Sequence, residues 1–337
     1  MPSDLDIVDR KLLNHLQSSF PLVDRPFSEL GGRLEIPPAE VLSRIAELKA
    51  DNVVRQISAI FDTRRLGYKT SLVACRYDPQ DLEAGARVIN EHPGVSHNYE
   101  RNSEFNLWFT LAVPPDEDLA EAVADLAGRS GAEQHRLLPT IKFFKIGVNF
   151  DMVTEEGAAE KYFSPDGYNG DRLSDWNRVE LVTDSDIQAI RELQEDLPLE
   201  ERPFEPMAER LGISQTGLFD IAADFERRGI MRRYSAVLHH RRAGFKSNGM
   251  GVWNVPEERS EEVGQVMAGS KWVTHCYERP TYDDWRFSHY TMIHATSREK
   301  CEEVAGEISE ATGITDYKML YSTREYKKTR VRYFVQD

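Results

Sequence analysis

His97-Asn98-Tyr99-Glu100-Arg101 and His275-Cys276-Tyr277-Glu278-Arg279 are two versions of one pentapeptide, and they decide how the rest of the chain is interpreted. Other segments return at almost the same spacing: Arg25-Pro26-Phe27 as Arg202-Pro203-Phe204, and Leu66-Gly67-Tyr68-Lys69 as Ala243-Gly244-Phe245-Lys246. The offset changes only from 177 to 178 residues between these segments and the pentapeptides. Such a constant offset indicates that one unit has been duplicated, with one residue inserted.

The first part of each copy has the pattern of a winged helix-turn-helix. Apolar residues recur at helical spacing over three short segments, and a turn and a strand follow them. These segments lie at about 5–20, 28–33, 37–49 and 52–57 in the first copy, and at about 187–197, 205–211, 214–225 and 229–234 in the second. Three helices and a wing predict winged helix-turn-helix domains at 1–62 and 178–239.

The second part of each copy alternates strand-like and helix-like segments in the order βαββαβ, which predicts a ferredoxin-like domain. The segments of the first copy are 71–77, 81–90, 95–101, 105–113, 116–127 and 138–150, and the second copy repeats their order between 247 and 334. We expect these domains at 63–154 and 240–337. The stretch 155–177 is rich in Gly, Asp and Ser, so it is predicted to be a linker. The predicted fold class is therefore α+β, as a tandem repeat of the two domain types.

The composition argues against several classes of protein. The net charge of −15 opposes the counterion exchange on which general DNA binding depends. The chain has no run of about 18 apolar residues, and its acidic start at 1–6 does not resemble a secretory signal. Its three cysteines have no C-x-x-C spacing, which argues against a zinc or iron–sulfur site. We expect a cytoplasmic protein that binds no membrane and no metal ion of its own.

The repeated pentapeptides predict a binding surface, because alternate side chains of a strand share one face. The two sets of side chains are His97, Tyr99 and Arg101, and His275, Tyr277 and Arg279. A guanidinium grips carboxylates, a phenol offers a flat surface and a proton, and an imidazole titrates near neutrality or binds iron. Together they suit an anionic, planar, aromatic ligand. The alternative is a polar strand face that packs against another domain.

The two copies differ next to the pentapeptides. The short connection at 102–104 corresponds to a longer aromatic and charged loop at 280–286, which includes Trp285 and could cap a site. Trp108-Phe109-Thr110 aligns with His289-Tyr290-Thr291, so we expect His275 and His289 to face each other from adjacent strands. This asymmetry predicts that the second copy carries the chemistry and the first supports it; the alternative is a structural role for His289. The other histidines of this half, His239, His240 and His294, are expected to be solvated or to pack outside the pocket.

The last strands contain the strongest basic cluster of this acidic chain: Arg324, Lys327, Lys328, Arg330 and Arg332. Lys142 aligns with Arg324, and Lys145 with Lys327. A substrate with many carboxylates would require local positive charge of this kind. A solvated edge is the alternative interpretation.

The third helices do not have the side chains of a typical DNA reader. They combine acidic and basic residues: Glu40, Arg44, Glu47 and Lys49 in one copy, and Asp220, Asp224, Glu226, Arg227 and Arg228 in the other. Neither set is the cluster of basic and amide groups that reads base edges and grips phosphates. We expect no specific DNA binding.

A winged helix followed by βαββαβ resembles the Lrp/AsnC superfamily of transcription factors. Two long segments, HPGVSHNYERNSEFNLWFT at 92–110 and YSTREYKKTRVRYF at 321–334, are similar to one specialised branch, the sirohaem decarboxylases. The two halves of these enzymes occur as separate subunits or as one fused chain. The resemblance implies conversion of the C12 and C18 acetates of sirohaem to methyls, giving 12,18-didecarboxysirohaem, in alternative haem or haem d1 biosynthesis. It also implies an internal pseudo-dimer, with a homo-oligomer possible, and no cofactor beyond the iron of the substrate.

Loss of carbon dioxide from an acetate leaves electrons on a methylene carbon, and a protonated pyrrole can hold them, so a general acid is required. We expect His275 and His289 to supply it, with Arg279, Arg324 and Lys327 positioning carboxylates. Tyr277 and Trp285 would contact the macrocycle, and His97, Tyr99 and Arg101 would support binding. Two other functions stay open at this point: an Lrp/AsnC-type DNA-binding regulator, and a haem or sirohaem sensor without catalysis.

Overall fold

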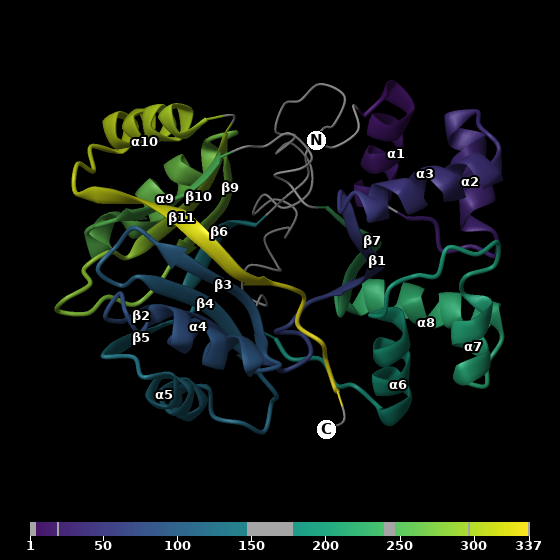
Figure 1. Ribbon diagram of the computed structural model, residues 1–337, viewed down its shortest axis with the longest axis horizontal. Helices are drawn as coiled ribbons and strands as arrows, with labels where there is room; N and C mark the ends of the chain where they lie inside the picture. The colour runs from purple at the N-terminus through teal and green to yellow at the C-terminus, as the bar shows by residue number, and fades with distance from the viewer. Residues whose placement is uncertain (1–4, 19, 147–177, 239–246, 296, 336–337) are drawn as a thin grey trace.

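The computed structural model of the protein describes residues 5–18, 20–146, 178–238, 247–295 and 297–335 (Figure 1). The predicted linker at 155–177 lies outside the described residues, as do His239 and His240.

The two winged helix-turn-helix units pack against each other as one body. The first contains α1 (Ile7–Ser18), α2 (Pro26–Leu34), α3 (Pro38–Ala50) and β1 (Val54–Phe61), and the second contains α6 (Asp184–Leu193), α7 (Glu205–Arg210), α8 (Gln215–Arg228) and β7 (Met231–Leu238). Strands β1 and β7 pair with each other in antiparallel fashion, and one apolar core joins both units. Reciprocal ion pairs, Arg25 with Glu201 and Arg202 with Asp24, cross between them.

The start of α6 shows why the predicted helices form where they do. Thr183 and Asp186 make the two reciprocal hydrogen bonds of a capping box, which satisfies amide groups that have no partner within the helix. The helix then buries Ala189, Ile190 and Leu193 on one face. Because these apolar residues follow the helical period, α6 packs onto the shared core.

The ferredoxin-like units follow the predicted order of elements. The first contains β2 (Lys69–Arg76), α4 (Leu82–Glu91), β3 (Val95–Arg101), β4 (Leu107–Val113), α5 (Leu119–Ser130) and β5 (Gln134–Leu138). The second contains β8 (Ser247–Trp253), α9 (Ser260–Gly269), β9 (Val273–Glu278), β10 (His289–Ala295), α10 (Arg298–Thr312) and β11 (Tyr317–Lys328), with a short 3-10 helix at Glu257–Arg259. The helices cover the outer faces, so the inner faces of the two half-sheets are turned toward each other (Figure 1).

The final strand of the first copy differs from the prediction of one strand at 138–150. It is divided into β5 and β6 (Lys142–Ile146), with Pro139 between them. Proline has no amide hydrogen to donate, so it interrupts the ladder. Strand β5 pairs with β2 of its own copy, whereas β6 pairs with β9 of the other copy.

Strand β11 makes the same exchange in the opposite direction. Its first residues pair with β8, and the residues from Ser322 to Lys328 pair with β3 of the first copy. The exchange joins both copies into a nine-stranded sheet of order β5-β2-β4-β3-β11-β8-β10-β9-β6. Each copy therefore completes the sheet of the other, and the fused chain forms an internal pseudo-dimer.

Candidate active site

A cavity of about 600 Å³ lies between the inner faces of the two half-sheets, and both copies line it. All six predicted pentapeptide side chains reach it: His97, Tyr99, Arg101, His275, Tyr277 and Arg279. The intervening residues point to the helices, where the Asn98 amide donates to the Ala86 carbonyl and the Cys276 thiol is buried against Gly264. The prediction that each set shares one strand face is confirmed.

A β-bulge precedes each cavity histidine. Val95 and His97 pair with Leu111 and Thr110, so that Ser96 is the extra residue; Thr274 occupies the same position between Val273 and His275. A bulge changes the direction of a side chain beside a site. The hydroxyl of Ser96 thereby lies 3.0 Å from Nδ1 of His97, and that of Thr274 lies 2.9 Å from Nδ1 of His275.

The two cavity arginines are each anchored on the last strand of the other copy. Nη1 of Arg101 donates to the Leu320 carbonyl at 3.2 Å, and Nη1 of Arg279 donates to the Leu138 carbonyl. The Nε atom of each is buried without a hydrogen-bond partner among the described residues. Burial lowers the pKa of both groups, to about 10 for Arg101, yet both stay charged at neutral pH. Each guanidinium lines the cavity and uses Nη1 for its anchor, so the rest of the group suits a ligand that brings carboxylate oxygens.

The cavity histidines are neutral when the cavity is empty. Burial, together with the charge of nearby cations, lowers the pKa of His97 and of His275 to about 4. The cations beside His97 include Lys328, and those beside His275 include Arg232 and Arg279. A ligand that brings negative charge to these imidazoles would raise their pKa.

The cavity carries more positive charge than the sequence predicts. Three cations not assigned to the site, Arg64, Arg232 and Lys328, line it together with Arg101 and Arg279. Asp62 is the one acidic residue among the lining residues, and it pairs with Arg232 at 2.7 Å. Lys328 belongs to the basic cluster that is visible in the sequence. Arg64 follows the wing strand β1, and Arg232 lies in the wing strand β7. Their approach to the cavity depends on how the winged helices pack, which no local pattern encodes.

The expectation that His289 faces His275 is wrong. His275 is paired with Met292, whereas His289 is paired with Glu278 and points to the helix side of the sheet. Its Nε2 lies 3.1 Å from the Ser260 carbonyl and its ring stacks on Phe144. The side chain is completely buried there.

A one-residue error in alignment explains this difference. Tyr99 pairs with Trp108 and Tyr277 with Tyr290, so Tyr290, and not His289, is the counterpart of Trp108. In a strand, a shift of one residue moves a side chain to the opposite face.

Three further residues predicted for the site lie elsewhere. Trp285 is buried in the core between the half-sheets, where its Nε1 donates to the Tyr290 hydroxyl at 2.7 Å. Arg324 forms an exposed ion pair with Glu83 of α4. Lys327 donates to two carbonyls at the end of α4, those of Asn90 and His92. The last two both lie on the helix side because irregularities in the pairing of β11, between Ser322 and Arg324 and between Glu325 and Lys327, interrupt its alternation, and Lys328 is the residue that lines the cavity.

The expectation that His294 lies outside the pocket, which the sequence analysis shared between this residue and the undescribed His239 and His240, is wrong, because His294 lines the cavity. Among the described residues, no group of three or more His, Cys, Asp or Glu side chains could hold a metal ion. Within the same ranges, no helix is long and apolar enough to cross a membrane.

The family models match both halves of the chain. The model described as "AsnC-like ligand binding domain" matches residues 65–145 and 242–327, and "Siroheme decarboxylase NirDL-like HTH domain" matches 9–55 and 186–232.

Curated relatives and solved structures give the same result. The chain is 40% identical to the sirohaem decarboxylase of Hydrogenobacter thermophilus, over 97% of this chain and 95% of the relative. It is 45% identical to the sirohaem decarboxylase beta subunit of Methanosarcina barkeri, over 44% of this chain and 97% of that subunit. The crystal structure of the sirohaem decarboxylase NirDL with an iron-uroporphyrin III analogue is similar at a TM-score of 0.72 and 35% identity, covering 97% of this chain and 95% of that one.

Proposed function

Because the chain belongs to the sirohaem decarboxylase family, we propose that it converts the C12 and C18 acetates of sirohaem to methyl groups and releases two molecules of carbon dioxide. The observation that supports this most directly is the charge of the cavity. Five cationic side chains and three imidazoles line it, against one carboxylate. Sirohaem carries eight carboxylates, which such a surface would attract and orient.

The arginines supply orientation. Arg101 and Arg279 approach from opposite copies, and the guanidinium of each lies beside the ring of the tyrosine of its own pentapeptide, at 5.7 Å and 4.8 Å. A planar guanidinium that is anchored through one Nη atom has further N–H groups, which could donate to a carboxylate without loss of the backbone anchor. Carboxylates held at both ends would fix the macrocycle between the two half-sheets.

His275 is the general acid in this proposal. Its Nδ1 is hydrogen-bonded to Thr274, which leaves Nε2 as the nitrogen that can reach a substrate. Burial is the main cause of the low pKa of His275 and nearby cations add to it, and carboxylates of the bound substrate would offset the contribution of the cations. The imidazole would then take up a proton when the substrate is present, and pass it to the methylene carbon as the bond to the carboxylate breaks.

Anaerobic incubation of the purified protein with sirohaem, followed by mass spectrometry of the tetrapyrrole, tests the proposal. We expect a product that has lost two molecules of carbon dioxide. Bound sirohaem of unchanged mass would instead indicate a sensor or carrier. The exposed Arg324 provides a control, because Arg324→Gln removes a cation outside the cavity and should leave conversion intact.

A further inference from the structure

Asp62 and Arg232 form an ion pair in the part of the cavity wall that the winged helices supply. Both residues line the cavity, and they come from different copies. Asp62 directly follows β1, and its amide donates to the Ile230 carbonyl at 2.8 Å, which holds it beside the start of β7. Nε and Nη2 of Arg232 both donate to Oδ2 of Asp62, at 3.1 Å and 2.7 Å. The winged helices therefore bring a cation to the cavity together with a carboxylate that holds it.

Asp62 keeps other partners if Arg232 turns to a ligand. Its Oδ1 atom accepts from the amides of Arg64 and Arg65, at 3.0 Å and 3.3 Å, and lies 3.8 Å from Nε of Arg64. Asp62 is only 3% exposed, and isolation of a buried carboxylate would be costly. Because these contacts remain, the ion pair can open without leaving the carboxylate isolated.

Arg232 acts on His275, the acid of the proposed reaction. Both line the same cavity, and Arg232 is the largest cause, after burial, of the low pKa of the imidazole. The corresponding arginine of the first copy, Arg55, is not among the lining residues; it donates to the Lys328 carbonyl and lies 3.7 Å from Glu325. A ligand carboxylate bound by Arg232 would therefore belong to the group that His275 protonates.

We propose that Arg232 exchanges Asp62 for the acetate that His275 protonates, and that this exchange distinguishes the substrate from its decarboxylated product. The inference rests on the proposed function. An acetate of sirohaem brings a second carboxylate to Arg232 and competes with Asp62 for its N–H groups. The product has a methyl group in place of that acetate, so it cannot compete, and Arg232 returns to Asp62.

The charges balance over one decarboxylation. The carboxylate leaves as neutral carbon dioxide, the electron pair of the broken carbon–carbon bond stays with the methylene carbon, and the proton from Nε2 of His275 completes the methyl group. Arg232 stays protonated throughout. Its renewed pair with Asp62 offsets the loss of its contact with the acetate, so that a firm hold on the substrate does not oppose the reaction.

Arg232→Gln tests the exchange, because it removes the charge and keeps a polar side chain. The Kd values for sirohaem and for the purified didecarboxylated product are measured by spectroscopic titration, in a His275→Ala background in which sirohaem is consumed slowly. We expect the Kd for sirohaem to rise about tenfold or more, and that for the product to change by less than about twofold. A variant that only disturbed the cavity would weaken the binding of both ligands alike.

Asp62→Asn should act in the opposite direction. The amide oxygen can still accept from the backbone of Arg64 and Arg65, but the competing charge is gone. In the same background we expect sirohaem to bind about threefold or more tightly, with little change for the product. With His275 intact and enzyme in excess over sirohaem, loss of carbon dioxide should slow by a similar factor, because the bound substrate is stabilised and no ion pair forms again afterwards.

Two further variants complete the experiment. The double variant Asp62→Asn with Arg232→Gln should bind both ligands as Arg232→Gln does, because Asp62 acts through Arg232. Asp9→Asn makes the same chemical change at a half-buried carboxylate of the winged helices, which pairs with Arg44 at 2.9 Å and does not line the cavity. It should alter neither affinity.

Equal changes in the affinities for sirohaem and for the product in Arg232→Gln would overturn the exchange. Weaker binding of sirohaem by Asp62→Asn, or an unchanged rate in that variant, would also overturn it. Absence of any decarboxylation by the parent protein is a different result, because it would contradict the proposed function itself.

Discussion

Arg101 and Arg279 make equivalent contacts from opposite copies, so the loss of either should weaken substrate binding. A hydrogen bond to a charged group contributes about 1.5–3 kcal/mol, and 1.4 kcal/mol corresponds to about tenfold in affinity. We expect Arg101→Ala and Arg279→Ala each to raise the Kd for sirohaem by about tenfold to a hundredfold in a spectroscopic titration. Unchanged affinity in both variants would mean that the carboxylates bind elsewhere.

His275 and His97 occupy equivalent positions, yet we expect them to differ in catalysis. Since His275 is the general acid, His275→Ala should lower turnover about a hundredfold or more, with a smaller effect on binding. His97→Ala should leave turnover within about tenfold of the parent, because it removes support and not the acid. His289→Ala provides a comparison at a residue on the helix side. Loss of turnover in His97→Ala alone would place the chemistry in the first half.

Burial of neutral histidines also predicts how stability depends on pH. The pKa of His275 and of His97 is about 4 in the folded protein, against an ordinary value of 6.5. Between these values the unfolded chain binds more protons, so the free energy of unfolding should fall as the pH falls from about 6.5 to 4. In His275→Gln the drop in Tm between pH 7 and pH 5 should be smaller than in the parent, when both are measured without ligand. An equal drop would contradict the low pKa.

Side-chain direction is the part of the site that the sequence predicts well within one strand and poorly between strands. The alternation of His97, Tyr99 and Arg101 needs no partner, and it was sufficient to place both pentapeptides on the cavity. The position of His289 depends on the alignment across loops of unequal length, at 102–106 and 280–288, where one residue reverses the face.

At the scale of elements, the order of helices and strands could be predicted because periodicity is local. The exchange of β6 and β11 between the copies could not be predicted. The residues of such a strand alternate in the same way whether the strand pairs within its own copy or with the other copy. Pro139 gives the only local sign, as a break between β5 and β6. The same exchange brings the carbonyls of Leu138 and Leu320 to the arginines of the opposite copy.

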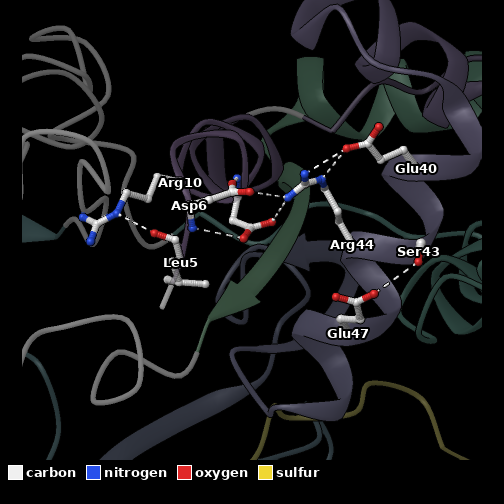
Figure 2. A network of polar contacts seen from close by, with 8 residues as sticks. Leu5, Asp6, Arg10, Glu40, Ser43, Arg44 and Glu47 are labelled. Atoms are coloured by element: carbon white, nitrogen blue, oxygen red, sulfur yellow. Dashed lines mark hydrogen bonds and ion pairs between the residues drawn. The ribbon is translucent and has the colours of Figure 1, made fainter. Parts of the chain in front are cut away.

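The third helices support the expectation that the protein does not bind DNA specifically. Figure 2 shows Arg44 of α3 held between Asp6 and Glu40, and it also contacts Asp9 at 2.9 Å. In α8, Arg228 pairs with Asp186 and Asp224 in a similar way. These guanidinium groups already have carboxylate partners, so they would have to exchange them for phosphates.

We expect no specific shift of DNA from the region upstream of the gene in an electrophoretic assay at about 0.15 M salt, where specific regulators bind at nanomolar concentrations. A sharp shift at nanomolar protein would overturn this prediction.

Over the whole molecule, the net charge is negative, whereas the lining of the central cavity is positive. The chain has a net charge of −15, while the lining of the central cavity has five cations and one acid. An acidic exterior repels polyanions such as nucleic acids in general, so a small anion must reach the buried cations to be retained. The overall charge therefore indicates which molecules can bind to the surface. It does not indicate which ligand binds in the cavity.

The last prediction concerns the dependence of each half on the other. The cavity takes its histidines, arginines and tyrosines from both copies, the sheet contains an exchanged strand from each, and the winged helices share one core. A relative from Methanosarcina barkeri is a separate beta subunit that matches 44% of this chain. We therefore expect that a chain divided within 155–177 forms an active heterodimer when its halves are produced together.

Either half alone should form a homodimer or aggregate, because the edge strands β3 and β9 would lose their partners from the other copy. A homodimer of the first half would contain two copies of His97 and no His275, so we expect it to decarboxylate sirohaem at no more than about a hundredth of the parent rate. Size-exclusion chromatography and the mass-spectrometric assay, applied to each half and to the mixture, would measure this. A single half that is monomeric and fully active would show that the cavity between the copies is not the site of the reaction.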